Sequence, residues 1–182
     1  PKGVVTAKAA GSVSITCEYS DSSGSASLTI DAVTLSSIAV TPAAKELAVG
    51  LTQQYIATGT YNDSSTKNIT DTVTWSRTNG TGTATITASG LVTAATAGTV
   101  TITATLGVAG SATLTVKATV TYDGNGSTGG TVPIDSSSPY SNGTTVTVLG
   151  NTGSLTKSGY TFNNWNTAAN GSGTSYSATN TF

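Results

Sequence analysis

The chain has 182 residues, only 8% of them charged, and its formal net charge is -1. So neutral a chain offers no basic surface, and we expect no nucleic-acid partner and no polybasic attachment to a membrane. Histidine is absent, which excludes a Ser-His-Asp triad, a Cys-His pair and any zinc site built with histidine. No run of about 18 apolar residues occurs, so we expect no membrane insertion.

The remaining residues give little support to catalytic or redox chemistry. Two carboxylates could still cleave a glycoside, but none of the eight acidic residues stands in a pattern that demands a partner. The single cysteine, Cys17, excludes an internal disulfide. We therefore predict that the chain is not an enzyme and that it needs no metal and no cofactor.

The first part of the chain repeats a later part. "GVVTAKAAGSVSITCEYSDSSGSASLTIDA" (Gly3–Ala32) is similar to "GLVTAATAGTVTITATLGVAGSATLTVKA" (Gly90–Ala118). Leu28 corresponds to Leu114 once the first copy is given one extra residue in its hairpin loop. Residues 1–33 are therefore predicted to be the C-terminal half of a module whose complete copy follows.

Residues 34–118 alternate apolar and polar side chains with a period of two. In "TVTITATL" (Thr99–Leu106), valine, isoleucine, alanine and leucine take one face and threonine takes the other. This pattern is typical of half-buried antiparallel strands. We predict a two-sheet antiparallel β-sandwich, in which the expected core residues are Val73, Trp75, Val100, Ile102, Leu114 and Val116. The only stretch whose residues favour a helix, "AAKELAVG" (Ala43–Gly50), is too short for us to predict a helix there.

Six motifs within this segment occur in the order and spacing of a known family. They are "IAVTP" (Ile38–Pro42), "QQYIATGTYND" (Gln53–Asp63), "VTWS" (Val73–Ser76), "SGLVTA" (Ser89–Ala94), "AGTVTITA" (Ala97–Ala104) and "SATLTV" (Ser111–Val116). Through them the segment resembles the bacterial immunoglobulin-like group 2 module (BIG2). The resemblance implies an Ig-like sandwich that occurs in tandem on bacterial surface and secreted proteins and in phage virion proteins. It implies no enzyme activity and no fixed ligand.

Residues 119–182 change character and resemble a second family. The motifs are "VTYDGNGSTGGTVP" (Val120–Pro133), "TVTVLGNTGSLTKSGYTF" (Thr145–Phe162) and "WNTAANGSGTSY" (Trp165–Tyr176). They resemble the Listeria–Bacteroides repeat of the internalin B-repeat type, which implies a small β-grasp-like unit on bacterial surface proteins. Two departures matter. Asn164 stands where the family usually has glycine, and a further strand usually follows "TF", so we expect this module to lack its last strand.

Trp165 has two interpretations. Tyr160 and Phe162 should share one strand face, and a β-bulge at Asn163–Asn164 would return Trp165 to that face as a core residue. Alternatively, exposed aromatic rings could stack on sugars. The candidate glycan-stacking residues are Trp165, Tyr176 and Tyr140.

Both ends of the chain are expected to need completion. Half a sandwich leaves an apolar face with Val13, Ile15, Leu28 and Ile30, which is unstable alone in water. Cys17, at the place of Ala104 in the repeat, is expected to be a small buried residue on that face. Flanking sequence of the same polypeptide could finish both modules. A neighbouring copy could instead donate the missing strands and so build head-to-tail fibres. The remaining alternative is that the half-module is disordered.

These observations predict a non-catalytic structural or adhesive stalk of a bacterial extracellular or cell-surface protein. The module junctions lack glycine and proline, which favours a stiff rod. The alternative is a carbohydrate-binding accessory module of a secreted enzyme or a phage virion protein. The expected partners are neighbouring modules of the same chain, copies of the chain itself, and surface glycans.

Overall fold

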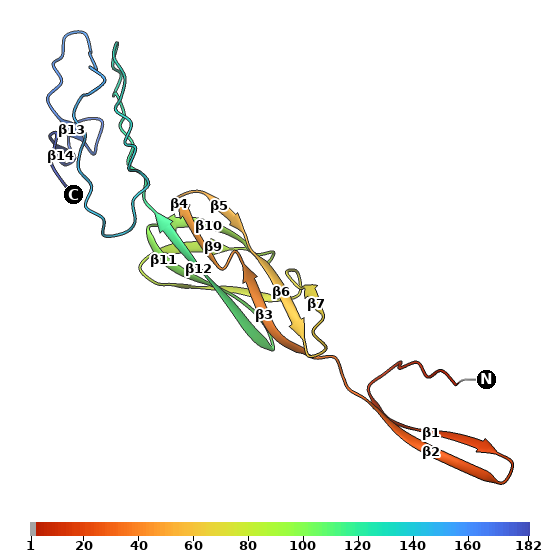
Figure 1. Ribbon diagram of the computed structural model, residues 1–182. Coiled ribbons are helices and arrows are strands. Elements are labelled where there is room, and N and C mark those ends of the chain that lie inside the picture. The colour runs from red at the N-terminus through yellow and green to blue at the C-terminus, as the bar shows by residue number, and fades with distance from the viewer. Residues whose placement is uncertain (1–2) are drawn as a thin grey trace.

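The computed structural model describes residues 3–182, and that part of the chain contains strands but no helices. Figure 1 shows three parts in succession: an N-terminal hairpin, a central sandwich and a C-terminal segment of mostly irregular backbone. The all-β class predicted from the sequence is confirmed. Within the described residues, none form a helix that could cross a membrane.

The N-terminal hairpin has the geometry of a later hairpin in the sandwich. It consists of β1 (Gly11–Tyr19) and β2 (Ser22–Ile30), which pair antiparallel along their whole length. β11 (Gly98–Leu106) and β12 (Val108–Lys117) pair in the same way. Two residues connect the first pair of strands, whereas Gly107 alone connects the second pair. The extra loop residue inferred from the sequence repeat is therefore present.

The apolar face of the N-terminal hairpin is uncovered within residues 3–182. Val13, Ile15 and Leu28 are 43%, 36% and 37% exposed. The corresponding residues of β11 and β12 are at most 1% exposed; they are Val100, Ile102 and Leu114. Cys17 is exposed, whereas its counterpart Ala104 is buried. The prediction that Cys17 is buried is wrong because, in the described part of the chain, no second sheet packs on this hairpin.

The sandwich is built from three hydrogen-bonded sheets around one core. Its other strands are β3 (Leu35–Thr41), β4 (Ala44–Ala48), β5 (Thr52–Gln54), β6 (Ile56–Tyr61), β7 (Thr66–Asn68), β8 (Thr74–Asn79), β9 (Thr83–Ile86) and β10 (Leu91–Thr96). The strand orders are β4-β12-β11-β8, β3-β6-β7 and β5-β10-β9. Side chains from all three sheets meet in a single apolar cluster.

The sandwich differs from the predicted two sheets because one of its two layers is divided into two sheets, and the division falls at Tyr55. Strands β11 and β12 pack against β3, β9 and β10, so the two three-stranded sheets together form the opposite layer. Tyr55 lies between β5 and β6, is fully buried, and donates its N–H to the Gly90 carbonyl oxygen at 2.9 Å. The chain thus passes from one sheet to the other at this residue, as strands do at the corners of sandwiches.

The predicted antiparallel arrangement is wrong for β4, which pairs parallel with β12. Its residues Ala44–Ala48 belong to the stretch Ala43–Gly50, whose composition favours a helix. Leu47 packs against the core. The Glu46 carboxylate forms an ion pair with the Lys117 ammonium, with an N···O distance of 2.7 Å. The free edge of β12 provides a hydrogen-bonding partner for this segment, and such tertiary pairing overrides a weak local helix propensity.

The predicted core of the sandwich is confirmed. All six expected residues are buried: Val73, Trp75, Val100, Ile102, Leu114 and Val116. The Trp75 indole N–H donates to the Thr70 carbonyl oxygen at 3.0 Å, so its burial leaves no unpaired donor. Tyr55 is the largest fully buried side chain, and its hydroxyl has no hydrogen-bond partner within the described residues.

The C-terminal module (residues 119–182) contains little regular strand. β13 (Trp165–Asn166) and β14 (Ser175–Tyr176) pair antiparallel, and isolated bridges join residues such as Gly129 and Thr156. A small apolar centre is formed by the buried side chains of Val146, Val148 and Leu155. This module therefore depends on loops and side-chain hydrogen bonds more than the sandwich does.

Tyr55→Phe should keep the free energy of unfolding unchanged or raise it by about 1 kcal/mol. Among residues 3–182 the buried phenol hydroxyl has no partner, and an unsatisfied buried polar group costs roughly 1–3 kcal/mol. Urea unfolding followed by circular dichroism measures the change, with Tyr55→Ala as a control that should lose about 3–5 kcal/mol by leaving a cavity. A clear loss of stability in the phenylalanine variant would contradict the unpaired hydroxyl.

Gly90→Ala should destabilise the sandwich more than Gly107→Ala. Both glycines have positive φ, +82° and +72°, so both variants share the strain of about 1–2 kcal/mol for a left-handed residue. A Cβ on Gly90 would lie 2.8 and 2.9 Å from Trp75 ring atoms, whereas Gly107 has no such neighbour within 4 Å. Overpacking should add about 1–3 kcal/mol at Gly90, and equal losses in urea unfolding would refute the contact.

Candidate binding cleft in the C-terminal module

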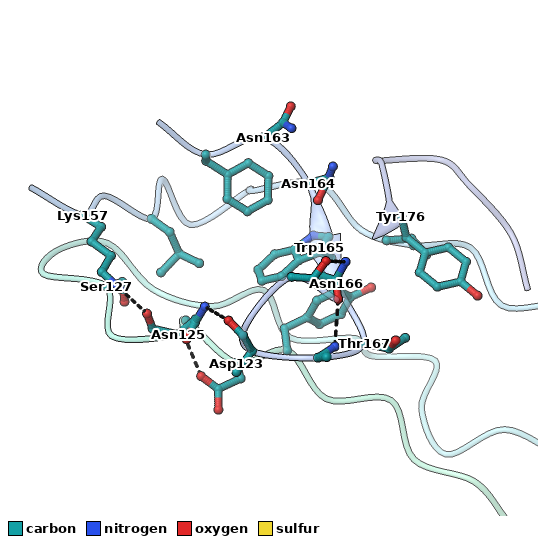
Figure 2. Close-up of a pocket in the computed structure, with 18 of the residues that line it drawn as sticks. Asp123, Asn125, Ser127, Lys157, Asn163, Asn164, Trp165, Asn166, Thr167 and Tyr176 are labelled. Carbon is teal, nitrogen blue, oxygen red and sulfur yellow. Dashed lines mark hydrogen bonds between the residues drawn. The ribbon is translucent and has the colours of Figure 1, made fainter. Parts of the chain in front are cut away.

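An open cleft of about 1150 Å³ lies on the C-terminal module (Figure 2). Two stretches of chain line most of it, residues 120–127 and residues 160–171. Its aromatic lining consists of Tyr122, Tyr160, Phe162, Trp165, Tyr176 and Phe182. The cleft therefore combines an apolar floor with backbone that is accessible from solvent.

Trp165 is the centre of an aromatic cluster in this cleft. Its ring centroid lies 4.7 Å from that of Tyr122 at an interplanar angle of 59°, and 5.0 Å from that of Phe162 at 70°. Tilted and edge-on contacts of this kind are favourable. The indole N–H also donates to the Leu149 carbonyl oxygen at 2.8 Å. Two rings and one hydrogen bond thus hold Trp165 in a half-buried position.

Trp165 reaches this position without the strand that the sequence predicts. Residues 160–164 form no strand, and Tyr160 is 74% exposed, so the predicted common face with a bulge at Asn163–Asn164 is wrong. Phe162 does contact Trp165, but it is still 38% exposed. The physical reason is that, within residues 3–182, no neighbouring strand pairs with this stretch and holds it straight.

The three candidate glycan-stacking residues do not form one platform. Trp165 and Tyr176 are cross-strand neighbours in β13 and β14, and both line the cleft. The Tyr176 ring already packs on Phe182 at a centroid distance of 5.2 Å. Tyr140 lies outside the cleft and donates its hydroxyl to Asp135 at 2.8 Å, a hydrogen bond that raises the pKa of Tyr140. Glycan stacking by Trp165 and Tyr176 stays a prediction.

Asparagine side chains shape the rim of the cleft. The Asn166 Oδ1 atom accepts hydrogen bonds from the N–H groups of Ala168 at 2.9 Å and Gly173 at 3.0 Å. The Asn125 side-chain amide donates to the Ala169 carbonyl oxygen at 2.8 Å. These amides bind backbone groups of the loop that contains Ala168, Ala169 and Gly173, here called the rim loop. Side-chain hydrogen bonds therefore fix this loop where regular strand pairing is missing.

The sequence reasoning missed Tyr122, which supplies the second ring of the aromatic cluster. Its hydroxyl accepts a hydrogen bond from the Leu149 N–H at 2.8 Å. The signal was present in "VTYD", where Val120 and Tyr122 alternate with polar residues. That alternation places both on one face, and both are half-buried and line the cleft.

The charged side chains that line the cleft are one carboxylate and one ammonium, Asp123 and Lys157. The Asp123 carboxylate accepts the Asn125 N–H at 2.7 Å, and the Lys157 ammonium donates to the Asn125 carbonyl oxygen at 2.8 Å. Within residues 3–182, no group of three or more metal-ligating side chains is present. This lining of rings, amides and free backbone is suited to binding a neutral ligand.

The chain is similar to part of a curated protein and to several solved structures. Ice-binding protein 1 of Shewanella frigidimarina is 45% identical over an alignment of 93 residues, which covers 48% of this chain and 10% of that protein. The chain thus spans about a tenth of the length of this relative. A crystal structure of the S-layer protein rSbsC is 19% identical with a TM-score of 0.46, covering 63% of this chain and 18% of that one. The structure of SbsC domains 4 and 5 is 19% identical with a TM-score of 0.44, covering 59% and 58%.

Two family profiles match consecutive parts of the chain. The bacterial Ig-like domain (group 2) matches residues 34–117, and the Listeria-Bacteroides repeat domain matches residues 119–182. Both families are those that the sequence motifs resemble, and the β-sandwich with its confirmed core agrees with the first of them. Residues 34–117 therefore belong to the group 2 bacterial Ig-like domains, and residues 119–182 belong to the Listeria-Bacteroides repeat domains.

Proposed function

We propose that this chain is a non-catalytic structural spacer in a bacterial extracellular or cell-surface protein. Both families imply modules of surface proteins. In Ice-binding protein 1 the matched part is only a tenth of the protein, as expected of modules that accompany another activity. The observation that carries the proposal is the way the three parts are joined, because each junction is bridged by hydrogen bonds instead of a free linker.

The first junction is clamped by Asn62. This residue lies at the end of the sandwich and contacts the segment between β2 and β3 with three hydrogen bonds. Its side-chain amide donates to the Ala32 carbonyl oxygen at 2.9 Å, and its Oδ1 atom accepts the Thr34 N–H at 3.0 Å. The Asn62 N–H donates to the Thr34 carbonyl oxygen at 3.0 Å. The segment that follows the hairpin is thereby tied to the sandwich immediately before β3 begins.

The second junction is a continuation of β12. Directly after that strand, Ala118 and Tyr140 exchange two backbone hydrogen bonds, with N···O distances of 2.8 and 2.7 Å. The Lys117–Glu46 ion pair lies one residue earlier and ties the end of β12 to β4. A strand that leaves one module and pairs at once in the next resists bending better than a flexible linker does.

The outer face of the sandwich is hydrated and almost uncharged. Thr101 of β11 has Thr113 and Thr78 as its register partners on the two adjacent strands. The next row of the same face is Ser76, Thr103 and Ser111. A surface of hydroxyl groups with few charges makes weak non-specific electrostatic contacts. That property suits a spacer that must not adhere to its surroundings.

Adhesion, fibre assembly and the extracellular location are finer parts of the proposal. The uncovered face of the N-terminal hairpin supports contact with a neighbouring module or with a second copy, and the choice between these partners stays a prediction. The group 2 Ig-like family supports the surface location. Nothing in the spacer role requires a catalytic group, a metal or a cofactor.

Asn62→Ala should loosen the first junction without unfolding the sandwich. The variant removes two side-chain hydrogen bonds, each worth roughly 0.5–1.5 kcal/mol net. Residual dipolar couplings measured by NMR should fit one alignment tensor for β1, β2 and the sandwich in the native chain. In the variant, the couplings of β1 and β2 should shrink relative to those of the sandwich.

The matched control for this experiment is Asn79→Ala. In the described part of the chain, the exposed Asn79 side chain accepts one hydrogen bond, from Arg77 of its own strand. This control should leave the couplings of β1 and β2 unchanged. Two results would contradict a role of Asn62 in fixing the first junction. One is that hairpin and sandwich need separate alignment tensors in the native chain. The other is that the couplings of β1 and β2 are the same in Asn62→Ala as in the native chain.

A further inference from the structure

We propose that the sandwich bears tension along the chain, and that the parallel pair of β4 and β12 is the element that resists this tension. The load is a pull applied through the segments before β3 and after β12. The spacer role concerns bending at the junctions, whereas load bearing concerns the force that unfolds the sandwich itself. The β4–β12 pair lies within the sandwich and does not depend on how the neighbouring parts are joined to it.

The first observation is that the chain enters and leaves the sandwich at opposite ends. β3 is the first strand of the sandwich and β12 is the last. Figure 1 shows that the segment after β2 reaches the sandwich at one end and that β12 leaves it at the other end. β3 and β12 run in the same direction in this view, and they pack against each other. A pull on the chain therefore drags the start of β3 and the end of β12 apart along the strand axes.

The second observation is that a load on β3 is passed to β12 through β4. Pro42 and Ala43 alone separate the end of β3 from the start of β4. β4 pairs parallel with β12 along its whole length, opposite residues Thr113 to Lys117. The pull thus acts on the N-terminal end of β4 and on the C-terminal end of β12. Two parallel strands that are pulled in this way slide along each other, so the hydrogen bonds between them must break together.

The pairing of β3 with β6 cannot replace this element. β3 does pair antiparallel with β6, but β6 is not one of the two strands through which the pull is applied. Release of β3 from β6 extends the chain by the length of one short strand. The sandwich then stays closed, because β4 still holds β12 and β12 still pairs with β11.

The third observation is that the β4–β12 pair is secured at both ends. At one end the Thr113 N–H donates to the Ala43 carbonyl oxygen at 2.9 Å, and at the other end the Val49 N–H donates to the Lys117 carbonyl oxygen at 3.0 Å. The Lys117 ammonium also forms its ion pair with the Glu46 carboxylate across the same two strands. The pair therefore has no loose end from which it could open.

The direction of each N–H group in β4 identifies the load-bearing donors. Alternate residues of a strand turn their N–H groups toward the same neighbour. Because the Val49 N–H faces β12, those of Lys45 and Leu47 face it as well. The N–H groups of Ala44 and Glu46 face away from β12, and β4 is the outer strand of its sheet. A proline at position 45 would thus remove a bond of the pair, whereas a proline at position 44 would not.

The main test compares two directions of pulling. Optical tweezers measure the force at which the sandwich opens in the 182-residue chain, with handles on introduced cysteines at exposed positions. One chain carries Val33→Cys and Thr119→Cys, which load β4 and β12 from opposite ends. The other carries Leu51→Cys and Thr119→Cys, which load them from the same end and open the pair bond by bond. Both chains carry Cys17→Ser, because the native thiol is exposed.

The opening force between positions 33 and 119 should be at least about twice the force between positions 51 and 119, because the evenly spaced bonds of a parallel pair break together only in the first geometry. Urea unfolding without load should give both chains the same midpoint, so a difference in stability cannot produce this ratio. A flexible junction on either side of the sandwich would refute the rigid spacer but would leave the ratio unchanged.

A pair of proline variants tests the bonds themselves. Lys45→Pro should lower the opening force between positions 33 and 119 by about a third or more, because proline has no N–H to donate to β12. Ala44→Pro should leave that force unchanged, because an outer strand accepts proline where the N–H faces solvent. Unchanged chemical shifts in β11 would show that each variant is folded. The comparison of pulling directions does not depend on either variant.

Two results would overturn the proposal. The first is an opening force between positions 33 and 119 that is equal to or lower than the force between positions 51 and 119. The second is an equal loss of force in Lys45→Pro and Ala44→Pro, which would assign the effect to the conformation of β4 and not to its bonds with β12.

Discussion

The alternating inner face of β11 and β12 is the surface on which the rest of the sandwich assembles. β12 pairs with β4, β11 pairs with β8, and the apolar row between them packs against the opposite layer. The chain has no methionine and only two phenylalanines, so this core is made mainly of small and β-branched residues. Backbone must then approach closely, as Gly90 does against the Trp75 ring. The stability of the module follows from this fit between small side chains, since packing density decides the cost of any change in a core.

The N-terminal hairpin shows that the alternating pattern alone does not bury a face. β1 and β2 repeat the register of β11 and β12, yet Val13 and Ile15 stay exposed. Burial of Val100 and Ile102 comes from the opposite layer, which the hairpin lacks in the described chain. The C-terminal module also lacks a covering layer in the described residues. Its aromatic cluster around Trp165 forms a floor, but two stretches of backbone beside that floor have no strand partner within residues 3–182.

The sequence predicted the parts of the structure that depend on local pattern. A period of two identified the strands and the six core residues of the sandwich, because side chains alternate across a pleated strand. Features set by remote partners were missed. The parallel pairing of β4 depends on the free edge of β12, and the change of sheet at Tyr55 depends on Gly90. Neither partner can be recognised from the residues of the segment itself.

The candidate site was predicted less well for the same reason. Trp165, Tyr176 and Tyr140 were the candidate glycan-stacking residues. The first two line one cleft, whereas Tyr140 lies outside it, where its hydroxyl binds Asp135. Tyr122 was missed although it contacts Trp165, because the two are far apart in the chain. The irregular backbone at residues 160–164 was also missed, since the spacing of aromatic residues predicts a strand only where a neighbouring strand can pair with it.

A spacer must keep its length, so the joints matter as much as the modules. Asn62 at one end of the sandwich and the Ala118–Tyr140 pair at the other replace flexible linkers with hydrogen-bonded contacts. Small-angle X-ray scattering of the intact chain in dilute solution tests this rigidity most directly. The expected result is a profile that a single extended arrangement of hairpin, sandwich and C-terminal module reproduces over the whole angular range. A profile that requires a broad ensemble of bent arrangements would contradict the rigid spacer.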